Sequence, residues 1–151
     1  MEADLLDKDS MVAAIAGSDY VAHTASPFYM NVSKENKDEL IKPALDGTLN
    51  CLEGCKASGG VKRVVVTSSM AAIQACAPAD KPADGVWNET HWSNPDREGG
   101  IHPYLESKTL AERAAWKFVE DLGDSEKFEL CTVNPCLVLG PAKNTEAFTS
   151  G

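Results

Sequence analysis

The chain has 151 residues, enough for one hydrophobic core, and 25% of them are charged. Acidic residues number 23 against 14 lysines and arginines, so the formal net charge is -9 at pH 7. A surface of that sign repels nucleic-acid phosphates and anionic membranes, which argues against both as partners. No apolar run approaches the roughly 18 residues of a membrane span, and the first residues hold no apolar signal core, so we expect a cytoplasmic protein.

The five cysteines occur at spacings that suggest neither a small oxidised scaffold nor a zinc site. Cys51 and Cys55 lie four apart, Cys76 stands alone, and Cys131 and Cys136 flank an apolar stretch. The three histidines do not fall at ligand spacing near them. We therefore expect no bound metal and interpret the cysteines as buried structural thiols.

The start of the chain predicts a short helix followed by a strand. Good helix formers occupy residues 11–16, with Asp9 or Ser10 as the N-cap and Gly17 as the stop. The short apolar run Tyr20–His23 then predicts a strand, which ends before a Thr-Ala-Ser-Pro sequence.

The middle of the chain predicts a longer helix, a buried strand and a long loop. Apolar residues recur at three- and four-residue steps over residues 40–52, and the pattern ends at the Ser-Gly-Gly of residues 58–60. The β-branched run 61–67 predicts a strand that is covered on both faces. Prolines, glycines and charges crowd residues 76–103, which predicts a surface loop, and loops of that length tend to be functional.

The last part of the chain predicts the longest helix, over residues 104–122, and a strand over residues 128–133. Strands and helices therefore alternate along the chain, which predicts an α/β fold: part of a doubly wound, Rossmann-like parallel sheet with helices on both faces. Ligands of such sheets bind beyond the carboxyl ends of the strands. Those ends are residues 24–27, 68–72 and 134–141, which are rich in small, polar and proline residues.

Tyr104 and Lys108 lie four apart at the start of the longest helix, so their side chains share one face. A phenol has an ordinary pKa near 10, and a nearby ammonium favours its phenolate form, which makes proton transfer feasible near neutral pH. Taken alone, the spacing is also typical of a solvated helix face. Its position after a strand that ends in Thr-Ser-Ser favours a carbonyl-reducing site, where a serine hydroxyl binds the substrate oxygen.

Seven ordered segments give the chain a resemblance to the extended short-chain dehydrogenase/reductase superfamily, in its dihydroflavonol 4-reductase-like branch. They are Ala3-Asp4-Leu5, VAHTASPF from Val21, IKPALDGTLNCLEGC from Ile41, VKRVVVTSS from Val61, NETHWS from Asn88, YLESKTLAERAAW from Tyr104 and NPCLVLGP from Asn134. The segment from Asn88 resembles this reductase branch more than the sugar-nucleotide epimerases.

The resemblance implies roles for individual residues. Ser69, with Ser68 as the alternative, would orient the carbonyl, and Tyr104 would be the general acid in reduction. Lys108 would favour the phenolate and bind the nicotinamide ribose. The residues that the resemblance places along the cofactor are Asp4, Leu5, Thr24, Ser26, Tyr104, Lys108, Pro135 and Val138. NADP is the cofactor expected from the branch, with NAD as the alternative.

One family feature is missing from the sequence. The Gly-rich turn that holds a dinucleotide pyrophosphate at the start of a helix does not occur, because no glycines have the G-x-x-G-x-x-G spacing. We therefore interpret residues 1–151 as an incomplete NAD(P)-binding domain from the middle of a longer reductase. The first predicted strand should then present an open edge that can pair with another chain.

These observations predict an NAD(P)H-dependent reductase of a ketone or aldehyde, a small-molecule carbonyl substrate. Two alternatives remain. The chain could be a catalytically silent Rossmann-like fragment that acts only by pairing with another protein, or an epimerase or dehydratase of a sugar nucleotide.

Overall fold

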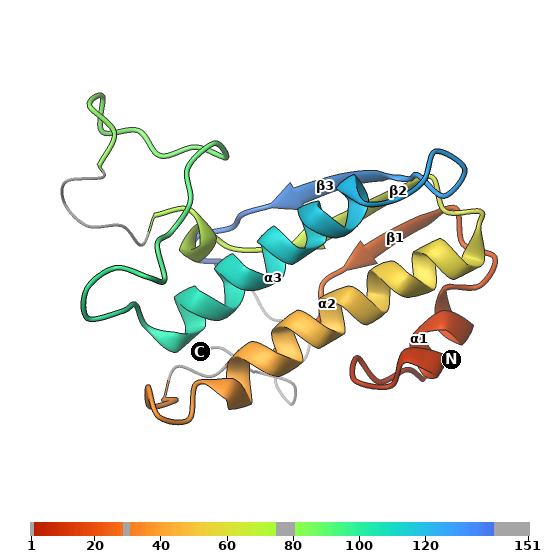
Figure 1. Cartoon of the computed structure of the whole chain (residues 1–151), viewed down its shortest axis with the longest axis horizontal. Helices are drawn as coiled ribbons and strands as arrows, with labels where there is room; N and C mark the ends of the chain where they lie inside the picture. The colour runs from red at the N-terminus through yellow and green to blue at the C-terminus, as the bar shows by residue number, and fades with distance from the viewer. Residues whose placement is uncertain (1, 29–30, 75–80, 141–151) are drawn as a thin grey trace.

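The computed structural model describes residues 2–28, 31–74 and 81–140 (Figure 1). Strands and helices alternate in it, which confirms the predicted α/β class. The elements are α1 (Lys8–Ile15), β1 (Tyr20–His23), α2 (Asp38–Ser58), β2 (Arg63–Thr67), the short 3₁₀ helix η1 (Met70–Ala72), α3 (Pro103–Glu120) and β3 (Glu129–Val133).

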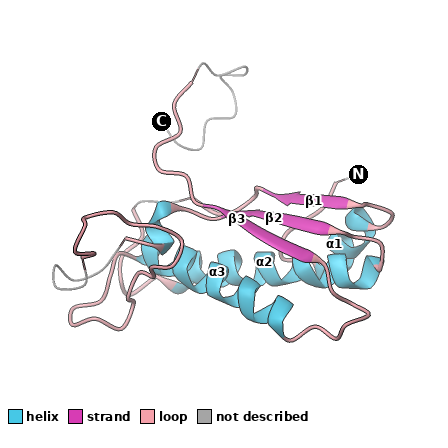
Figure 2. Ribbon diagram, turned by 90° about the horizontal axis from the view of Figure 1, so that it is seen from above, coloured by secondary structure: helices cyan, strands magenta, loops and turns pink. Residues whose placement is uncertain are grey.

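The three strands form one parallel sheet in the order β1-β2-β3. Figure 2 shows α2 and α3 side by side on one face of this sheet. The expectation of helices on both faces therefore does not hold for the described residues. The reason is topological: the strand order has no reversal, so crossovers of the same hand return on the same side of the sheet.

The strands are buried on one face only. Val64, Val66 and Leu130 point toward the helices and are at most 9% exposed. On the opposite face, Tyr20 is 68% and Val133 is 51% exposed. The prediction that the β-branched run is covered on both faces is wrong for the described part of the chain, where it follows the alternation of a half-buried strand.

The hydrophobic core lies between the sheet and the helices. Its buried members are Ile15, Cys51, Leu52, Cys55, Val61, Val64, Val66, Ala115, Leu122, Phe128 and Leu130. Cys51 and Cys55 are thus buried thiols, as predicted. Cys131 and Cys136 are exposed, which corrects the interpretation of all the cysteines as buried. Cys131 lies on the uncovered face of β3, Cys136 follows the end of that strand, and Cys76 lies outside the described residues.

Helix α1 begins earlier than the sequence predicts. Asp7, rather than Asp9 or Ser10, is its N-cap, and the Asp7 carboxylate accepts hydrogen bonds from the amides of Asp9 at 3.0 Å and Ser10 at 3.2 Å. The Ser10 hydroxyl instead donates to the carbonyl of Asp4 at 3.1 Å, which holds the N-terminal segment against the helix. Asp7, Asp9 and Ser10 are all good N-cap residues, so the sequence alone could not show which of them caps the helix.

Two glycines of α2 allow neighbouring segments to approach it closely. A Cβ atom on Gly54 would lie 2.8 Å from Ile15 Cδ1 and 3.3 Å from the Met11 carbonyl oxygen. A Cβ atom on Gly47 would lie 3.1 Å from Leu5 Cβ. The absence of side chains at these two positions therefore sets how α1 and the segment before it pack on α2.

The long loop before α3 is described from residue 81 onward and contains no helix or strand there, in agreement with the prediction. Ser93 fastens it to η1, since its amide donates to the carbonyl of Ala72 at 2.8 Å and its hydroxyl to that of Ala71 at 2.7 Å. The loop is therefore held next to the carboxyl end of β2.

Candidate active site

The start of α3 fixes the place of the two residues that the sequence singled out. His102 is the N-cap, and its Nδ1 accepts a hydrogen bond from the Tyr104 amide at 3.2 Å. Pro103 occupies the first turn, where the missing amide hydrogen costs nothing. Tyr104 thus stands in the first turn of the helix, and Lys108 follows one turn later.

The side chains of Tyr104 and Lys108 lie next to each other. The Lys108 ammonium lies 5.9 Å from the centre of the Tyr104 ring. On another side, the Phe28 ring contacts Tyr104 edge-on, with ring centres 5.0 Å apart and planes at 84°. Tyr104 is half-buried, so the ring is held by its neighbours while part of it remains accessible.

Ser69 faces the same cavity as Tyr104. It follows β2 and caps η1, where its hydroxyl oxygen accepts a hydrogen bond from the Ala71 amide at 3.1 Å. The cavity has a volume of about 460 Å³ and is lined by Phe28, Ser69, Met70, Ala71, Gln74, Tyr104, Leu105, Cys136 and Leu137. The structure therefore brings one hydroxyl, one phenol and a mainly apolar wall together.

Ser68, the alternative for the serine role, does not line this cavity. Its side chain is 7% exposed, and its hydroxyl donates a hydrogen bond to the carboxylate of Glu112. Neighbouring residues at a strand end point to opposite sides, so only one of the two serines can face the cavity. The geometry favours Ser69.

Lys108 is a buried cation for which the described residues supply no hydrogen-bond acceptor. Its side chain is 8% exposed, and burial lowers the pKa of the ammonium below its ordinary value. Among the residues that the structure describes, its one specific contact is the Tyr104 ring. A desolvated ammonium gains free energy from any ligand that brings oxygen acceptors to it. Such a group is typical of a binding site.

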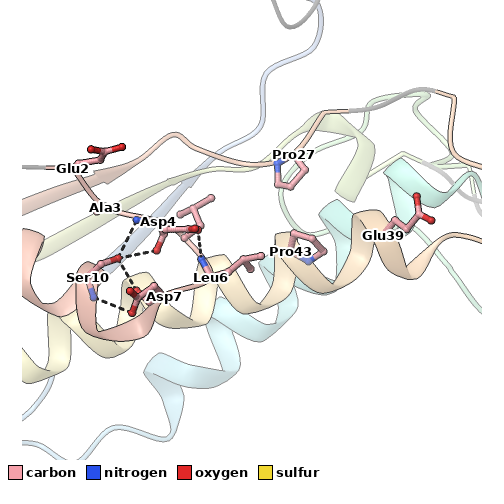
Figure 3. A pocket seen from close by; sticks show the side chains of 10 residues that line it. Glu2, Ala3, Asp4, Leu6, Asp7, Ser10, Pro27, Glu39 and Pro43 are labelled. Carbon is pink, nitrogen blue, oxygen red and sulfur yellow. Dashed lines mark hydrogen bonds between the residues drawn. The ribbon is translucent and has the colours of Figure 1, made fainter.

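Asp4 and Leu5 line a different cavity, of about 720 Å³, formed by the N-terminal segment, the segment after β1 and α2 (Figure 3). The Asp4 carboxylate accepts a hydrogen bond from the Leu6 amide at 2.9 Å. The Leu5 carbonyl accepts one from Asn50 Nδ2 at 2.8 Å, which ties the segment to α2. Pro27 forms part of the same cavity, so the structure brings the N-terminal pair to the end of β1.

The remaining predicted residues lie at the strand ends. Ser26 and Lys108 line one narrow crevice, whereas Thr24 is exposed and outside it. The Pro135 carbonyl accepts a hydrogen bond from the Met70 amide at 3.0 Å, so the turn after β3 adjoins the turn after β2. Val138 is 82% exposed and lines none of these cavities.

Sequence reasoning missed three residues of this region. The Phe28 ring packs on the Tyr104 ring. Asn134 Nδ2 donates a hydrogen bond of 2.8 Å to the Glu112 carboxylate. The sequence could have indicated Glu112, because it lies four residues after Lys108 and therefore on the same helix face as Tyr104 and Lys108. Asn134 lies in the predicted strand end 134–141 and Phe28 in the segment from Val21, but their individual contacts were not predictable, since their partners are distant in sequence.

A family model described as the 3-beta hydroxysteroid dehydrogenase/isomerase family matches residues 1–149. The chain belongs to this family. Cinnamoyl-CoA reductase of Medicago truncatula is 43% identical over 142 residues, which cover 93% of this chain and 41% of that protein. Anthocyanidin reductase of Vitis vinifera is 37% identical over 155 residues, covering 98% and 43%. These relatives confirm the resemblance to a reductase branch of the short-chain dehydrogenases.

The solved structures agree in fold. Yeast methylglyoxal/isovaleraldehyde reductase Gre2, complexed with NADPH, has a TM-score of 0.76 and 34% identity, covering 93% of this chain and 44% of that one. Vestitone reductase of alfalfa has a TM-score of 0.65 and 32% identity, covering 87% and 38%. The chain thus spans less than half the length of the relatives it matches.

Two further findings concern residues 2–28, 31–74 and 81–140. No three histidine, cysteine, aspartate or glutamate side chains come together there as a metal site. No helix in these ranges is long and apolar enough to cross a membrane.

Proposed function

We propose that the chain carries the proton-transfer groups of an NAD(P)H-dependent reductase of ketones or aldehydes, with NADPH as the cofactor. The observation that carries this proposal is the shared cavity of Ser69 and Tyr104, with the Lys108 ammonium beside the Tyr104 ring. The names of the relatives and the NADPH in the yeast structure support it. Residues 1–151 then form part of an NAD(P)-binding domain.

Each of the three side chains has a role in this reaction. The Ser69 hydroxyl donates a hydrogen bond to the substrate carbonyl oxygen and fixes its position. The Tyr104 phenol gives its proton to that oxygen as the carbonyl becomes an alcohol. The Lys108 ammonium favours the phenolate that remains. The bound nicotinamide supplies the hydride.

The residues present fit parts of the cofactor. The Lys108 ammonium, which no described residue pairs with, suits the hydroxyl oxygens of the nicotinamide ribose, and Ser26, which lines the same crevice, suits the middle of the cofactor. The cavity at Asp4 and Leu5 has room for the adenosine end. In this proposal Thr24, Pro135 and Val138 line the cofactor between and beyond these points.

The cavity wall indicates the kind of substrate. Phe28, Met70, Ala71, Leu105 and Leu137 make most of it apolar. An apolar wall around one hydroxyl and one phenol favours a small carbonyl compound with a hydrophobic body. A sugar nucleotide, the substrate class of the epimerase alternative, would leave its many hydroxyls facing that wall without partners.

The test is oxidation of NADPH, followed by its absorbance, with a panel of aliphatic and aromatic aldehydes and ketones. Tyr104→Phe should lower the rate by about 100-fold or more, because it removes the proton donor. Tyr20→Phe is the matched control: Tyr20 is 68% exposed on the open face of the sheet, and its loss should leave the rate unchanged. Equal rates in the two variants would refute the proposal.

The silent-fragment alternative rests on a different feature, the outer edge of β1. In the described residues β1 pairs only with β2, so its other edge has free backbone groups. We propose that this edge allows self-association, which size-exclusion chromatography over a range of concentrations would detect. We also place the protein in the cytoplasm, since Cys51, Cys55, Cys131 and Cys136 are free thiols.

A further inference from the structure

Glu112 is a buried carboxylate that the proposed reaction does not use. It lies on α3, one turn after Lys108, and its side chain is 6% exposed. None of the ion pairs among the described residues includes it. A buried carboxylate without a cation depends on hydrogen-bond donors for its stability.

The donors to Glu112 come from the ends of two strands. Its Oε2 accepts hydrogen bonds from the Ser68 hydroxyl, after β2, and from Asn134 Nδ2, after β3, the latter at 2.8 Å. Its Oε1 accepts a longer bond of 3.4 Å from Trp116 Nε1. One carboxylate thus joins α3 to the carboxyl ends of both strands.

The connection continues to Ser69. Asn134 Nδ2 also donates to the Ser69 carbonyl at 3.2 Å. Two backbone hydrogen bonds also join the strand ends: the Ser68 amide donates to the Val133 carbonyl at 2.9 Å and the Met70 amide to the Pro135 carbonyl at 3.0 Å. We call these two bonds, together with those of Glu112 and Asn134, the clasp. The main chain of Ser69 is therefore held relative to α3 through Asn134 and the Glu112 carboxylate.

We propose that Glu112 is a positioning residue that sets the place of Ser69 relative to Tyr104 and Lys108. Tyr104 and Lys108 belong to the same rigid helix as Glu112, whereas Ser69 belongs to a strand end. A hydrogen-bonded link between the two fixes their separation better than apolar packing, because hydrogen bonds are directional. The consequence for catalysis rests on the proposed function, while the clasp itself does not.

Local hydrogen exchange, followed by NMR, tests the clasp without any need for activity. In Glu112→Gln the amides of Ser68 and Met70 should exchange at least about 10-fold faster, while those of residues 64–66 stay within about 2-fold. The matched control is Glu120→Gln, two turns later on α3, where the carboxylate is exposed and the exchange should not change. Parallel acceleration of all amides, or none at Ser68 and Met70, overturns the proposal.

A second variant covers the case in which Glu112→Gln does not fold. Asn134→Ala keeps the carboxylate and its bond from Ser68 but removes the link to the Ser69 carbonyl. It should accelerate exchange at Met70 by a similar factor, again with residues 64–66 unaffected. An unchanged Met70 amide in this variant contradicts the proposal.

A double-mutant cycle on NADPH oxidation tests the catalytic consequence. Glu112→Gln should lower kcat about 10-fold or more and change KM by less than about 2-fold, since only the reacting geometry is disturbed. In a Ser69→Ala background the same change should alter kcat by less than about 2-fold, because the hydroxyl it positions is gone. Equal losses in both backgrounds overturn the proposal.

Hydrogen exchange and kinetics together distinguish a failure of the Glu112 proposal from a failure of the proposed reductase function. If the unsubstituted chain reduces no carbonyl compound, the proposed function fails, and the hydrogen-exchange result alone decides the role of Glu112. If it is active and Glu112→Gln leaves kcat unchanged, the proposed function stands and Glu112 is only a structural anchor.

Discussion

The Lys108 ammonium lies 5.9 Å from the centre of the Tyr104 ring, and the Lys108 side chain is 8% exposed. Burial lowers the pKa of Lys108, because the charged form loses hydration that no described acceptor replaces. The fold thus keeps a buried cation at a place where its charge lowers stability and where, in the proposed reaction, it favours the phenolate of Tyr104. Groups held in this way are common at functional sites.

Replacing Lys108 should therefore stabilise the chain while removing the proposed activity. We expect Lys108→Met to raise the free energy of unfolding at pH 7 by about 1 kcal/mol, or roughly 3 °C in Tm for a chain of this size. Thermal unfolding followed by circular dichroism measures this. Lys42→Met, at an exposed lysine of α2, is the control and should have little effect. A lower Tm for Lys108→Met than for the unsubstituted chain would contradict the argument.

The same burial predicts how stability depends on pH. The folded-state pKa of Lys108 lies below its ordinary value of 10.5, so between the two values the unfolded chain holds a proton that the folded chain has lost. The penalty of burying the charge is therefore full at lower pH and disappears as the pH rises toward 10.5. The stability difference between Lys108→Met and the unsubstituted chain should shrink over that range in urea titrations. A difference independent of pH would contradict the prediction.

Gly54 should not tolerate a side chain. A Cβ atom there would lie 2.8 Å from Ile15 Cδ1 and 3.3 Å from the backbone oxygen of Met11, so Gly54→Ala should destabilise the chain by about 1–3 kcal/mol. At Gly60 the nearest atoms would be 3.9 Å away, and Gly60→Ala serves as the control. Urea unfolding compares the two. Equal midpoints would show that α1 moves away from α2 at no cost.

The thiols should divide into two reactive classes. In a Cys76→Ser background, Cys131 and Cys136 are exposed and should react with a thiol reagent in the folded chain. Hydrogen bonds with Cys55 and His23 lower the pKa of Cys51, but Cys51 and Cys55 are each 1% exposed. Access therefore limits their reaction, and both should react only after unfolding in urea. Four thiols reacting at one rate under native conditions would contradict the burial.

NADPH should bind this chain weakly. The sequence contains no Gly-x-x-Gly-x-x-Gly turn, the feature whose backbone amides hold the pyrophosphate at a helix start in dinucleotide-binding domains. We expect a dissociation constant above about 0.1 mM by fluorescence titration, which corresponds to less than about 5.5 kcal/mol. Lys108→Met should weaken binding further. A dissociation constant in the low micromolar range would show that other residues hold the pyrophosphate.

Periodicity in the sequence was sufficient to predict most of the elements. Strand β1 has the predicted bounds, and α2, β2, α3 and β3 differ only at their ends. The face on which helices lie was not predictable in this way, because the apolar pattern of one strand does not encode the strand order. The sequential order of the sheet, which places both crossover helices on one side, is a property of the whole chain.

The site was predictable where its residues share one element. Tyr104 and Lys108 follow from the four-residue repeat of a helix. The repeat cannot decide between Ser68 and Ser69. That choice depends on η1, which Ser69 caps, and on the Glu112 carboxylate, which accepts a hydrogen bond from the Ser68 hydroxyl. Val138 was assigned by resemblance and is exposed here, since nothing in the described residues packs against it.

The sequential strand order also bears on how this sheet is made during synthesis. Among the described elements, each strand pairs only with a strand next to it in the chain, and both crossover helices lie side by side on one face of the sheet. The pairing of β1 with β2 is therefore available once residue 67 has left the ribosome, and α3, which packs against α2, and β3 can be added afterwards without rearranging that pair. Such a topology favours folding in the order in which the strands are synthesised.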